Sequence, residues 1–336
     1  STVKKILIDK DPAVRKEHKA FLNQLKWAQE LATALKEKRR TRGSIDFNLP
    51  EPEFKLDGKG NVASIRKAER NFAHQLIEEF MLAANEAVAE FFSQRSIPAI
   101  YRVHEPPDPL KTEEFLEFTQ SLGINLPPFE NTSSWYAQAL NQCKDSQFEY
   151  IVNNLLIRSM KQAHYAATNV GHFGLASSDY THFTSPIRRY PDLMVHRQLI
   201  QCIHQSTPDK NKQKNIQAVK EHGEFLSARE RTAVLAERAM NDRLKISFMK
   251  AKVGETFDAI ISGVNESALF IEITEHCISG SIAVDRLQDD YYIYDQKKHR
   301  LFGETSNRVY SIGDPVQVTL VDVDSYQKRL NFSPAN

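Results

Sequence analysis

The stretch from His172 to Leu199 contains the densest set of side chains in the sequence that could do chemistry. It holds three histidines, four aromatic residues, three arginines and two prolines. Pro186 and Pro191 each fix a backbone φ and remove an N–H donor, so the residues between them cannot lie in the middle of a helix. Apolar residues follow Pro191 at helical spacing, so Pro191 is predicted to be the first helical position.

This spacing predicts a rigid turn that presents Arg188 and Arg189 beside a helix N-terminus. Unpaired amides, the positive end of the helix dipole and guanidinium groups together suit a phosphate. The alternative is a solvated arginine pair ahead of an ordinary helix. The flanking prolines and aromatic residues favour the phosphate site.

Composition narrows the class of protein. The 336 residues allow about two domains, and 41% hydrophobic content is enough for a sizeable core. Because the net charge is only +1, any nucleic-acid site must come from local clustering of basic residues. The three cysteines (Cys143, Cys202 and Cys277) lie far apart, which argues against a disulfide framework and a structural zinc. No apolar run approaches a membrane span and no leader is present, so a cytoplasmic protein with no membrane association is expected.

The segment GHFGLASSDYTHFTSPIRRYPDLMVHR, residues 171–197, resembles the C-terminal signature of the catalytic domain in the ribonuclease II / ribonuclease R family. These are processive, hydrolytic 3′-to-5′ exoribonucleases, and the resemblance extends over essentially the whole chain. It implies that the chain acts on the 3′ end of single-stranded RNA and releases nucleoside 5′-monophosphates. It also implies that Arg188, the first arginine of SPIRRY, stabilises charge on the scissile phosphate, with Arg189 as a weaker phosphate contact.

Two more family segments carry implied RNA contacts. Residues 46–52 match a "DF-x-LP-E-P" segment, in which an aromatic at the Phe47 position sandwiches the terminal bases. Composition alone equally supports Phe47 as a core strand residue. Residues 77–85 match "IEE-x-M-x-x-AN", which implies that Glu78 contacts the terminal nucleotide. On the helix predicted over residues 70–92, Glu78 borders the apolar face and Glu79 points away, so the helix geometry also selects Glu78.

The remaining pattern predicts the supporting elements. Residues 1–8 are strand-like and begin without a lead, which suggests a segment of something longer. A helix is expected over 14–42, a strand over 43–50, and a hairpin around Asp57–Gly60. His104 has no partner at ligand spacing and is expected to be structural. Residues 206–214 are expected to form an exposed loop, followed by a long helix over 216–249.

Five short β runs between residues 253 and 332 predict an OB-type barrel that resembles the S1-type RNA-binding domain. Phe257 and Phe270 fall where such domains present aromatic rings to bases, although a core role for one of them competes with this interpretation. Ala283-Val284-Asp285 stands where the family often has His-Val-Ser. Loss of a stacking ring and gain of a negative charge weaken the RNA affinity expected of that face.

The predicted fold is therefore α+β: a C-terminal portion of the ribonuclease catalytic domain over residues 1–250, then an all-β S1-type OB-fold over 252–334. Family members hold Mg²⁺ with four clustered aspartates near the start of the catalytic domain. This sequence has only the isolated pairs Asp9/Asp11 and Asp289/Asp290, so no metal ligand is predicted in this chain.

Two functions remain open at this point. The first is a monomeric exoribonuclease segment whose Mg²⁺ ligands lie on the missing N-terminal half of the same enzyme. The second is a non-catalytic RNA-binding or scaffold protein that keeps the fold and has lost the metal site.

Overall fold

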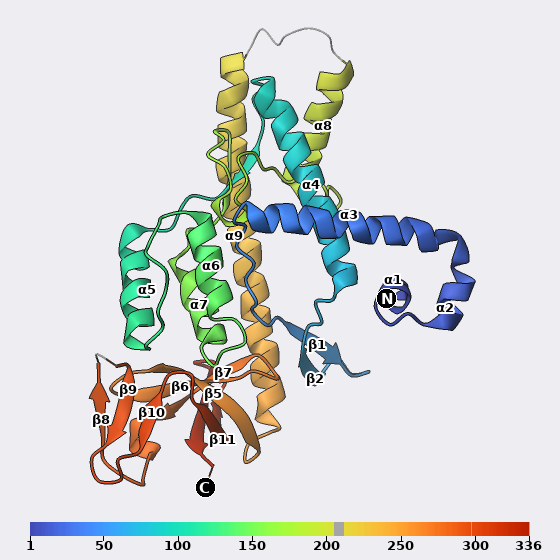
Figure 1. The fold of residues 1–336 in the computed structure, drawn as a ribbon. Coiled ribbons are helices and arrows are strands. Elements are labelled where there is room, and N and C mark those ends of the chain that lie inside the picture. The colour runs from blue at the N-terminus through green and yellow to red at the C-terminus, as the bar shows by residue number, and fades with distance from the viewer. Residues whose placement is uncertain (205–211, 297, 336) are drawn as a thin grey trace.

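The computed structural model describes residues 1–204, 212–296 and 298–335 (Figure 1). The helical part lies at one end of the molecule and a closed β-barrel at the other, and the longest helix runs between them (Figure 1). The helices are α1 Thr2–Leu7, α2 Pro12–Glu17, α3 Leu22–Thr41, α4 Phe72–Gln94, α5 Pro109–Ser121, α6 Ser133–Gln142, α7 Glu149–Ser159, α8 Tyr190–His204 and α9 Lys212–Lys250. Most of the loop expected over 206–214 falls in residues 205–211, outside the described ranges.

The strands are short in the helical part and longer in the barrel. They are β1 Pro52–Leu56, β2 Val62–Lys67, β3 Tyr101–Val103, β4 His164–Ala166, β5 Thr256–Val264, β6 Ala268–Ile273, β7 Ile278–Ala283, β8 Tyr292–Asp295, β9 Arg300–Gly303, β10 Val309–Ser311, β11 Pro315–Asp324 and β12 Arg329–Pro334. Short 3₁₀ turns cover Lys19–Phe21, Phe173–Leu175 and Val284–Arg286.

The N-terminal segment corrects the strand expected over residues 1–8. These residues form α1, where the Ser1 side chain accepts a hydrogen bond from the Lys4 amide. Ile6 is buried, and α1 packs against α3 and α4. The β-branched residues suggested a strand, but tertiary packing of a short amphipathic turn outweighs that weak local preference.

The single helix expected over 14–42 is divided. Asp11 caps α2 by accepting from the Ala13 and Val14 amides, and Pro12 occupies the first turn, as turn chemistry predicts. The helix then ends at His18, and the 3₁₀ turn Lys19–Phe21 leads into α3. The hydrophobic pattern continues across residues 18–21, so the break between α2 and α3 has no sign in the sequence.

The strand expected over 43–50 is also wrong, because these residues pair with no strand in the described ranges. They run between the signature segment and α7: the Ile45 amide donates to the Gly174 carbonyl at 2.8 Å and the Asn48 amide to Asn153 Oδ1 at 3.0 Å. The β1–β2 hairpin that follows is confirmed, with Phe54 opposite Ile65.

Two clusters form the core of the helical part. One joins the C-terminal half of α4 to β3, β4, α8 and α9, with Phe92, Tyr165 and Val195 at its centre. The other packs α5, α6 and α7 together around Tyr136 and Leu156. β3 and β4 form a two-stranded antiparallel sheet, which directs the signature segment across the first cluster.

The barrel has the strand order β11-β12-β7-β6-β5, so the five predicted strands are confirmed. A three-stranded meander, β8-β9-β10, is inserted before β11 and was not predicted. The predicted fold class, mixed helices and strands followed by an OB-type barrel, is confirmed.

The barrel core continues into the helical part. Ile246 and Met249 of α9, Ile65 of β2 and Ile151 of α7 belong to the same buried cluster as the barrel interior. Near its middle α9 packs on β4, where Ser227 Oγ accepts from the Tyr165 amide at 2.9 Å. α9 ends at Lys250 and β5 begins at Thr256; the boundary between 1–250 and 252–334 stays a prediction. Among the described residues, no helix is long and apolar enough to cross a membrane.

Candidate catalytic and RNA-binding site

Asp192 organises the turn that carries the two signature arginines. It is the third residue of α8 and its side chain is fully buried. Its Oδ1 accepts from the Ser185 amide at 2.8 Å and from an Arg189 guanidinium nitrogen at 2.7 Å. The Arg188 and Arg189 amides both donate to the Ser185 carbonyl. These bonds close residues 185–192 into one rigid unit, as the prolines predict. We call this unit the signature turn.

The two arginines have different environments within this unit. Arg189 is mostly buried against Asp192, and its Nε has no hydrogen-bond partner in the described part of the chain. Arg188 is exposed, and its guanidinium makes no hydrogen bond or ion pair with any described residue. A buried carboxylate already lies in the first turn of α8, where an anion would be expected. The phosphate contact predicted there stays a prediction, and of the two arginines Arg188 has the exposed guanidinium.

α4 and β3 hold the approach to the turn. The buried Asn85 donates to the Tyr180 hydroxyl at 3.0 Å and accepts from the Phe183 amide at 3.0 Å. The Arg102 amide donates to the Tyr180 carbonyl at 2.9 Å, and the Thr181 hydroxyl donates to the Ile100 carbonyl at 2.6 Å. Because both sides of the segment are bonded to the core, the turn is fixed relative to α4.

Three histidines, His172 and His182 within the signature segment and His104 beside it, are neutral and structural. His104 Nδ1 accepts from the Gly174 amide at 2.9 Å, so its Nε2 donates to the Lys161 carbonyl at 2.7 Å. Burial lowers the pKa of His104, and it lowers the pKa of His172 to about 3. Burial, together with the nearby Arg189 and Arg102 charges, also lowers the pKa of His182 to about 2.

Asp46 and Glu78 are brought together by an arginine that the sequence did not single out. Arg70 lies 3.0 Å from Asp46, the neighbour of Phe47, and 2.9 Å from Glu78, and all three side chains are about half exposed. Phe47 is partly buried and packs against the α5–α7 cluster, so it combines core contact with an accessible edge. Its role in base stacking stays a prediction.

The expectation that Glu79 points away from the core is wrong. Glu79 is buried and forms a two-pronged ion pair with the buried Arg39 of α3, at 2.7 and 3.3 Å. Glu78 is the partly exposed member of the pair, and its contact with the terminal nucleotide stays a prediction. The exposed Ile77 and the buried Glu79 show that the apolar face of α4 is rotated from the one predicted, because α3 covers that side.

Glu78 lies on the same side of α4 as the buried Asn85, which connects this helix to the signature turn. Glu78 and Asn85 are seven residues apart, about 10 Å along the same side of α4, and Asn85 bonds directly to the segment leading to Arg188. Asp192 and Arg70 were missed in the sequence. The signal for Asp192 was available: an acidic residue in the first turn of a helix, three residues after an arginine.

The two barrel phenylalanines lie on opposite sides of the barrel wall. Phe257 has the same strand phase as the buried Ala259 and Ile261, and its ring makes an edge contact with Phe332. Phe270 alternates with the buried Leu269 and Ile271, and its ring is exposed. The core interpretation therefore describes Phe257, and base stacking by the exposed Phe270 stays a prediction.

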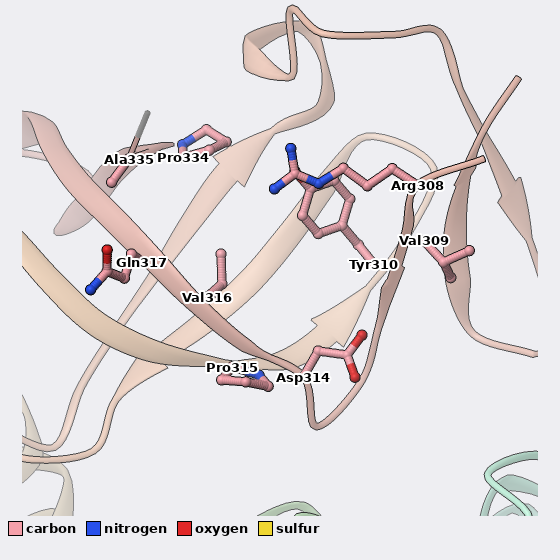
Figure 2. Close-up of a pocket in the computed structure, with 9 residues that line it drawn as sticks. All are labelled: Arg308, Val309, Tyr310, Asp314, Pro315, Val316, Gln317, Pro334 and Ala335. Atoms are coloured by element: carbon pink, nitrogen blue, oxygen red, sulfur yellow. The ribbon is translucent and has the colours of Figure 1, made fainter. Parts of the chain in front are cut away.

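The barrel also has a groove of about 430 Å³ between β10, the start of β11 and the end of β12 (Figure 2). Arg308 lies across the Tyr310 ring, 5.0 Å from its centroid, and pairs with Asp289 at 2.9 Å. Pro315 and Val316 line the groove beside them (Figure 2). None of its residues belongs to the signature turn or to α4, so the groove is separate from the Arg188 surface.

The magnesium implied by the family resemblance does not fit the residues present. Across residues 1–204, 212–296 and 298–335, no group of three or more histidine, cysteine, aspartate or glutamate side chains could hold a metal ion. The aspartate pairs have other partners: Asp11 caps α2, and Asp290 accepts from the Ser306 side chain and the Ser306 and Thr305 amides, contacts that lower its pKa.

Comparison with known proteins gives the same assignment for both parts of the chain. Residues 1–205 match the RNB domain and residues 250–334 match the S1 RNA binding domain. The ribonuclease R of Aquifex aeolicus (strain VF5) is 40% identical over 327 residues, covering 97% of this chain and 46% of the relative.

Two solved structures of Mycoplasma genitalium RNase R superpose closely. The apo form has a TM-score of 0.86 and 31% identity, and the complex with ribose methylated single-stranded RNA has 0.85 and 32%; each match covers 99% of this chain and 52% of that one. The chain therefore spans about half the length of the relatives it matches. Because the RNB model matches more than half of it, the chain belongs to the RNB domain family.

Proposed function

We propose that this chain is the RNA-holding part of a processive, hydrolytic 3′-to-5′ exoribonuclease that acts on single-stranded RNA and releases nucleoside 5′-monophosphates. The observation that carries the proposal is the signature turn, where Asp192 fixes Arg188 in an exposed position with no described partner. Cleavage of a phosphodiester develops negative charge on the phosphate, and a cationic side chain held beside it stabilises that charge. The RNase R relatives support the same reaction class.

In this proposal each residue has a stated role. Arg188 stabilises charge on the scissile phosphate. Glu78 contacts the terminal nucleotide, and Phe47 stacks on a terminal base. Phe270 stacks on RNA at the barrel. The proposal gives Phe257 no RNA contact, because its ring packs inward against Phe332.

Arg189 is a supporting residue in the proposal, because its charge is already matched by Asp192. The geometry favours it as the residue that holds the turn. A direct phosphate contact from Arg189 would require it to leave a buried carboxylate, which is strongly unfavourable.

The Mg²⁺ dependence and its ligands are also proposals. Since the described residues do not form a metal site, we assign the ligands to the complementary half of the enzyme, and no step is assigned to the ion here. We propose that the chain is monomeric before it meets that half. A non-catalytic scaffold is less well supported, because it has no need for an exposed arginine on a turn fixed by a buried carboxylate.

The test uses the chain purified alone, a fluorescently labelled single-stranded RNA and Mg²⁺, with binding and RNA length followed in parallel. We expect binding without shortening, and shortening from the 3′ end once the complementary half is supplied. Absence of RNA binding would contradict the proposal. Cleavage by the isolated chain that EDTA abolishes would show that its own carboxylates hold the metal.

A further inference from the structure

The extended segment over residues 44–48, which leads from α3 toward β1, is attached to its surroundings at both ends (Figure 1). At its start, Arg39 of α3 donates to Ser44 Oγ at 2.6 Å and to the buried Glu79 of α4 at 2.7 Å. At its end, the Asn48 side chain donates to a glutamate of α7 at 2.8 Å. The residues between these two anchors are therefore held close to α4.

Arg70 makes a second link between this segment and α4. Its Nη1 donates to Asp46 Oδ1 at 3.0 Å, and its Nη2 donates to the two carboxylate oxygens of Glu78 at 2.9 and 3.0 Å. The Arg70 backbone is itself fixed, because the next residue, Asn71, is the N-cap of α4 and accepts from the Ala73 amide. One guanidinium thus sets the separation of two carboxylates from different parts of the chain.

The two groups that Arg70 holds together repel each other. Asp46 and Glu78 contact the same guanidinium, so only a few ångström separate two negative charges. Among the described residues neither carboxylate has another ion-pair partner, and the nearby Arg39 is buried and paired with Glu79. Without Arg70 the two carboxylates would move apart, and Glu78 would lose its fixed distance from the segment.

The pair with Arg70 leaves the Glu78 carboxylate able to accept more hydrogen bonds. An ionised carboxylate has about four lone-pair sites, and the contact with Arg70 leaves some of them open. The Glu78 side chain is 41% exposed, so a ligand can reach it. The hydroxyl groups of a ribose are donors of the kind that such a carboxylate accepts.

We propose that Arg70 is a positioning residue for the 3′-terminal nucleotide of RNA. It orients the Glu78 carboxylate toward the terminal ribose and fixes the distance from Glu78 to the segment that carries Phe47. Arg70 acts through its partners rather than by attracting phosphates, because two carboxylates already match its charge. The inference rests on the proposed function, in which Glu78 and Phe47 contact the terminal nucleotide, and adds the residue that assembles this contact.

The experiment measures binding of the purified chain, in EDTA, to three 5′-labelled single-stranded RNAs that differ only at the 3′ end. The first RNA ends in an ordinary nucleotide. The second ends in a 2′,3′-dideoxynucleotide, which lacks the donors for Glu78, and the third ends in an abasic ribose, which lacks the base for Phe47. We expect the wild-type chain to bind the first RNA about tenfold more tightly than either modified RNA.

Arg70→Met is the informative variant. It should weaken binding of the unmodified RNA about tenfold and change the affinity for each modified RNA less than about threefold, because only the end-specific contacts are lost. Arg70→Lys should recover part of the preference, since an ammonium keeps the charge but cannot hold two carboxylates in the geometry of a guanidinium fork. Both variants should keep the urea midpoint of the wild-type chain, because Arg70 is about half exposed.

Arg300→Met is the matched control. Arg300 is also a partly exposed arginine in an ion pair, 3.2 Å from Asp295, but it lies in the β8–β9 hairpin. Its replacement should leave the preference for the ordinary 3′ end unchanged. An equal loss of preference in the two methionine variants would overturn the proposal.

Three other results also count against the role of Arg70. Equal weakening of all three RNAs by Arg70→Met would make Arg70 a general phosphate contact. Wild-type binding that ignores the 3′ end would remove the contact that Arg70 is proposed to assemble, and a variant that keeps the full preference would show that Glu78 needs no positioning. Failure of the proposed function looks different, because the wild-type chain would then bind none of the three RNAs.

Discussion

At the scale of single residues, the two signature arginines differ in their surroundings. Arg188 is exposed on the turn, whereas Arg189 is paired with the buried Asp192. Neighbours in sequence therefore have different environments, because one carboxylate can pair with only one of them. This difference gives two predictions.

Arg188→Met should lower the turnover of the assembled enzyme about 100-fold, because a preorganised cation is lost from the developing charge. RNA affinity should change less than about threefold, since the other contacts remain. Single-turnover RNA shortening and equilibrium binding measure the two quantities separately. Arg197→Met, at an exposed arginine of α8, is the control; equal losses of turnover and affinity would assign Arg188 to binding alone.

Asp192→Ala should lower the free energy of unfolding by about 3–5 kcal/mol, because Arg189 is left without its partner. Asp192→Asn keeps the size and an acceptor for the Ser185 amide, so it should lower the free energy less. Urea unfolding of both variants measures the difference. A loss below about 1 kcal/mol for Asp192→Ala would mean that the turn does not depend on this pair.

At the scale of elements, the β3–β4 sheet and the segment beside it are held by histidines that must be neutral. Burial lowers the pKa of His172 to about 3 and of His182 to about 2. In the unfolded chain both titrate near pH 6.5, so between that value and pH 3 the unfolded state binds more protons. Their contribution to stability is complete above pH 6.5 and is lost as the pH falls through this window.

Between pH 7 and pH 5, the free energy of unfolding should therefore fall by about 2 kcal/mol for each of the two histidines. His182→Asn and His172→Asn should each flatten this slope, whatever they do to stability at pH 7. Urea unfolding at a series of pH values measures it. His222→Asn, at an exposed position on α9, is the control, and an unchanged slope in all three variants would contradict the prediction.

Sequence reasoning predicted those elements whose signals are local. Asp11-Pro12 begins α2, Asp57–Gly60 turns the first hairpin, and the five barrel strands alternate as expected. The errors lie where a residue distant in sequence determines the backbone hydrogen bonds of a segment. Residues 43–50 are extended but bond to Gly174 and Asn153, more than 100 residues away in sequence, instead of to a strand.

The same limit applies to the candidate site. The motif and the helix periodicity selected Glu78, which is exposed beside Arg70. They could not place Glu79, because the Arg39 that buries it belongs to another helix. Arg70 pairs with Asp46, 24 residues away in sequence, as well as with Glu78, so only the folded chain shows that it holds these two side chains together.

At the scale of the whole molecule, the barrel and the helical part share a core. Met249 of α9 is fully buried in the barrel cluster, whereas Trp135 is buried in the α5–α7 cluster. Ile65 and Ile151 of the helical part belong to the barrel cluster as well. The two parts should therefore unfold together.

Met249→Ala should lower the free energy of unfolding by about 2–5 kcal/mol and shift both transitions equally. Trp135 fluorescence follows the helical part, and the far-ultraviolet circular dichroism follows the whole chain. Met240→Ala, at an exposed position on the same helix, should change stability by less than about 0.5 kcal/mol. A Trp135 transition that stays in place while the rest of the chain melts earlier would show that the barrel unfolds independently.

α9 also fixes the distance between the helical part and the barrel. It is anchored on β4 at Ser227 and in the barrel core at Met249, and these two points lie about 33 Å apart along a continuous helix. Because α9 is stiff, an RNA strand must exceed a minimum length before it can contact both the barrel and the signature turn. Under the proposed function, an RNA shorter than that minimum length binds the barrel or the signature turn alone, without the gain in local concentration that comes from holding both.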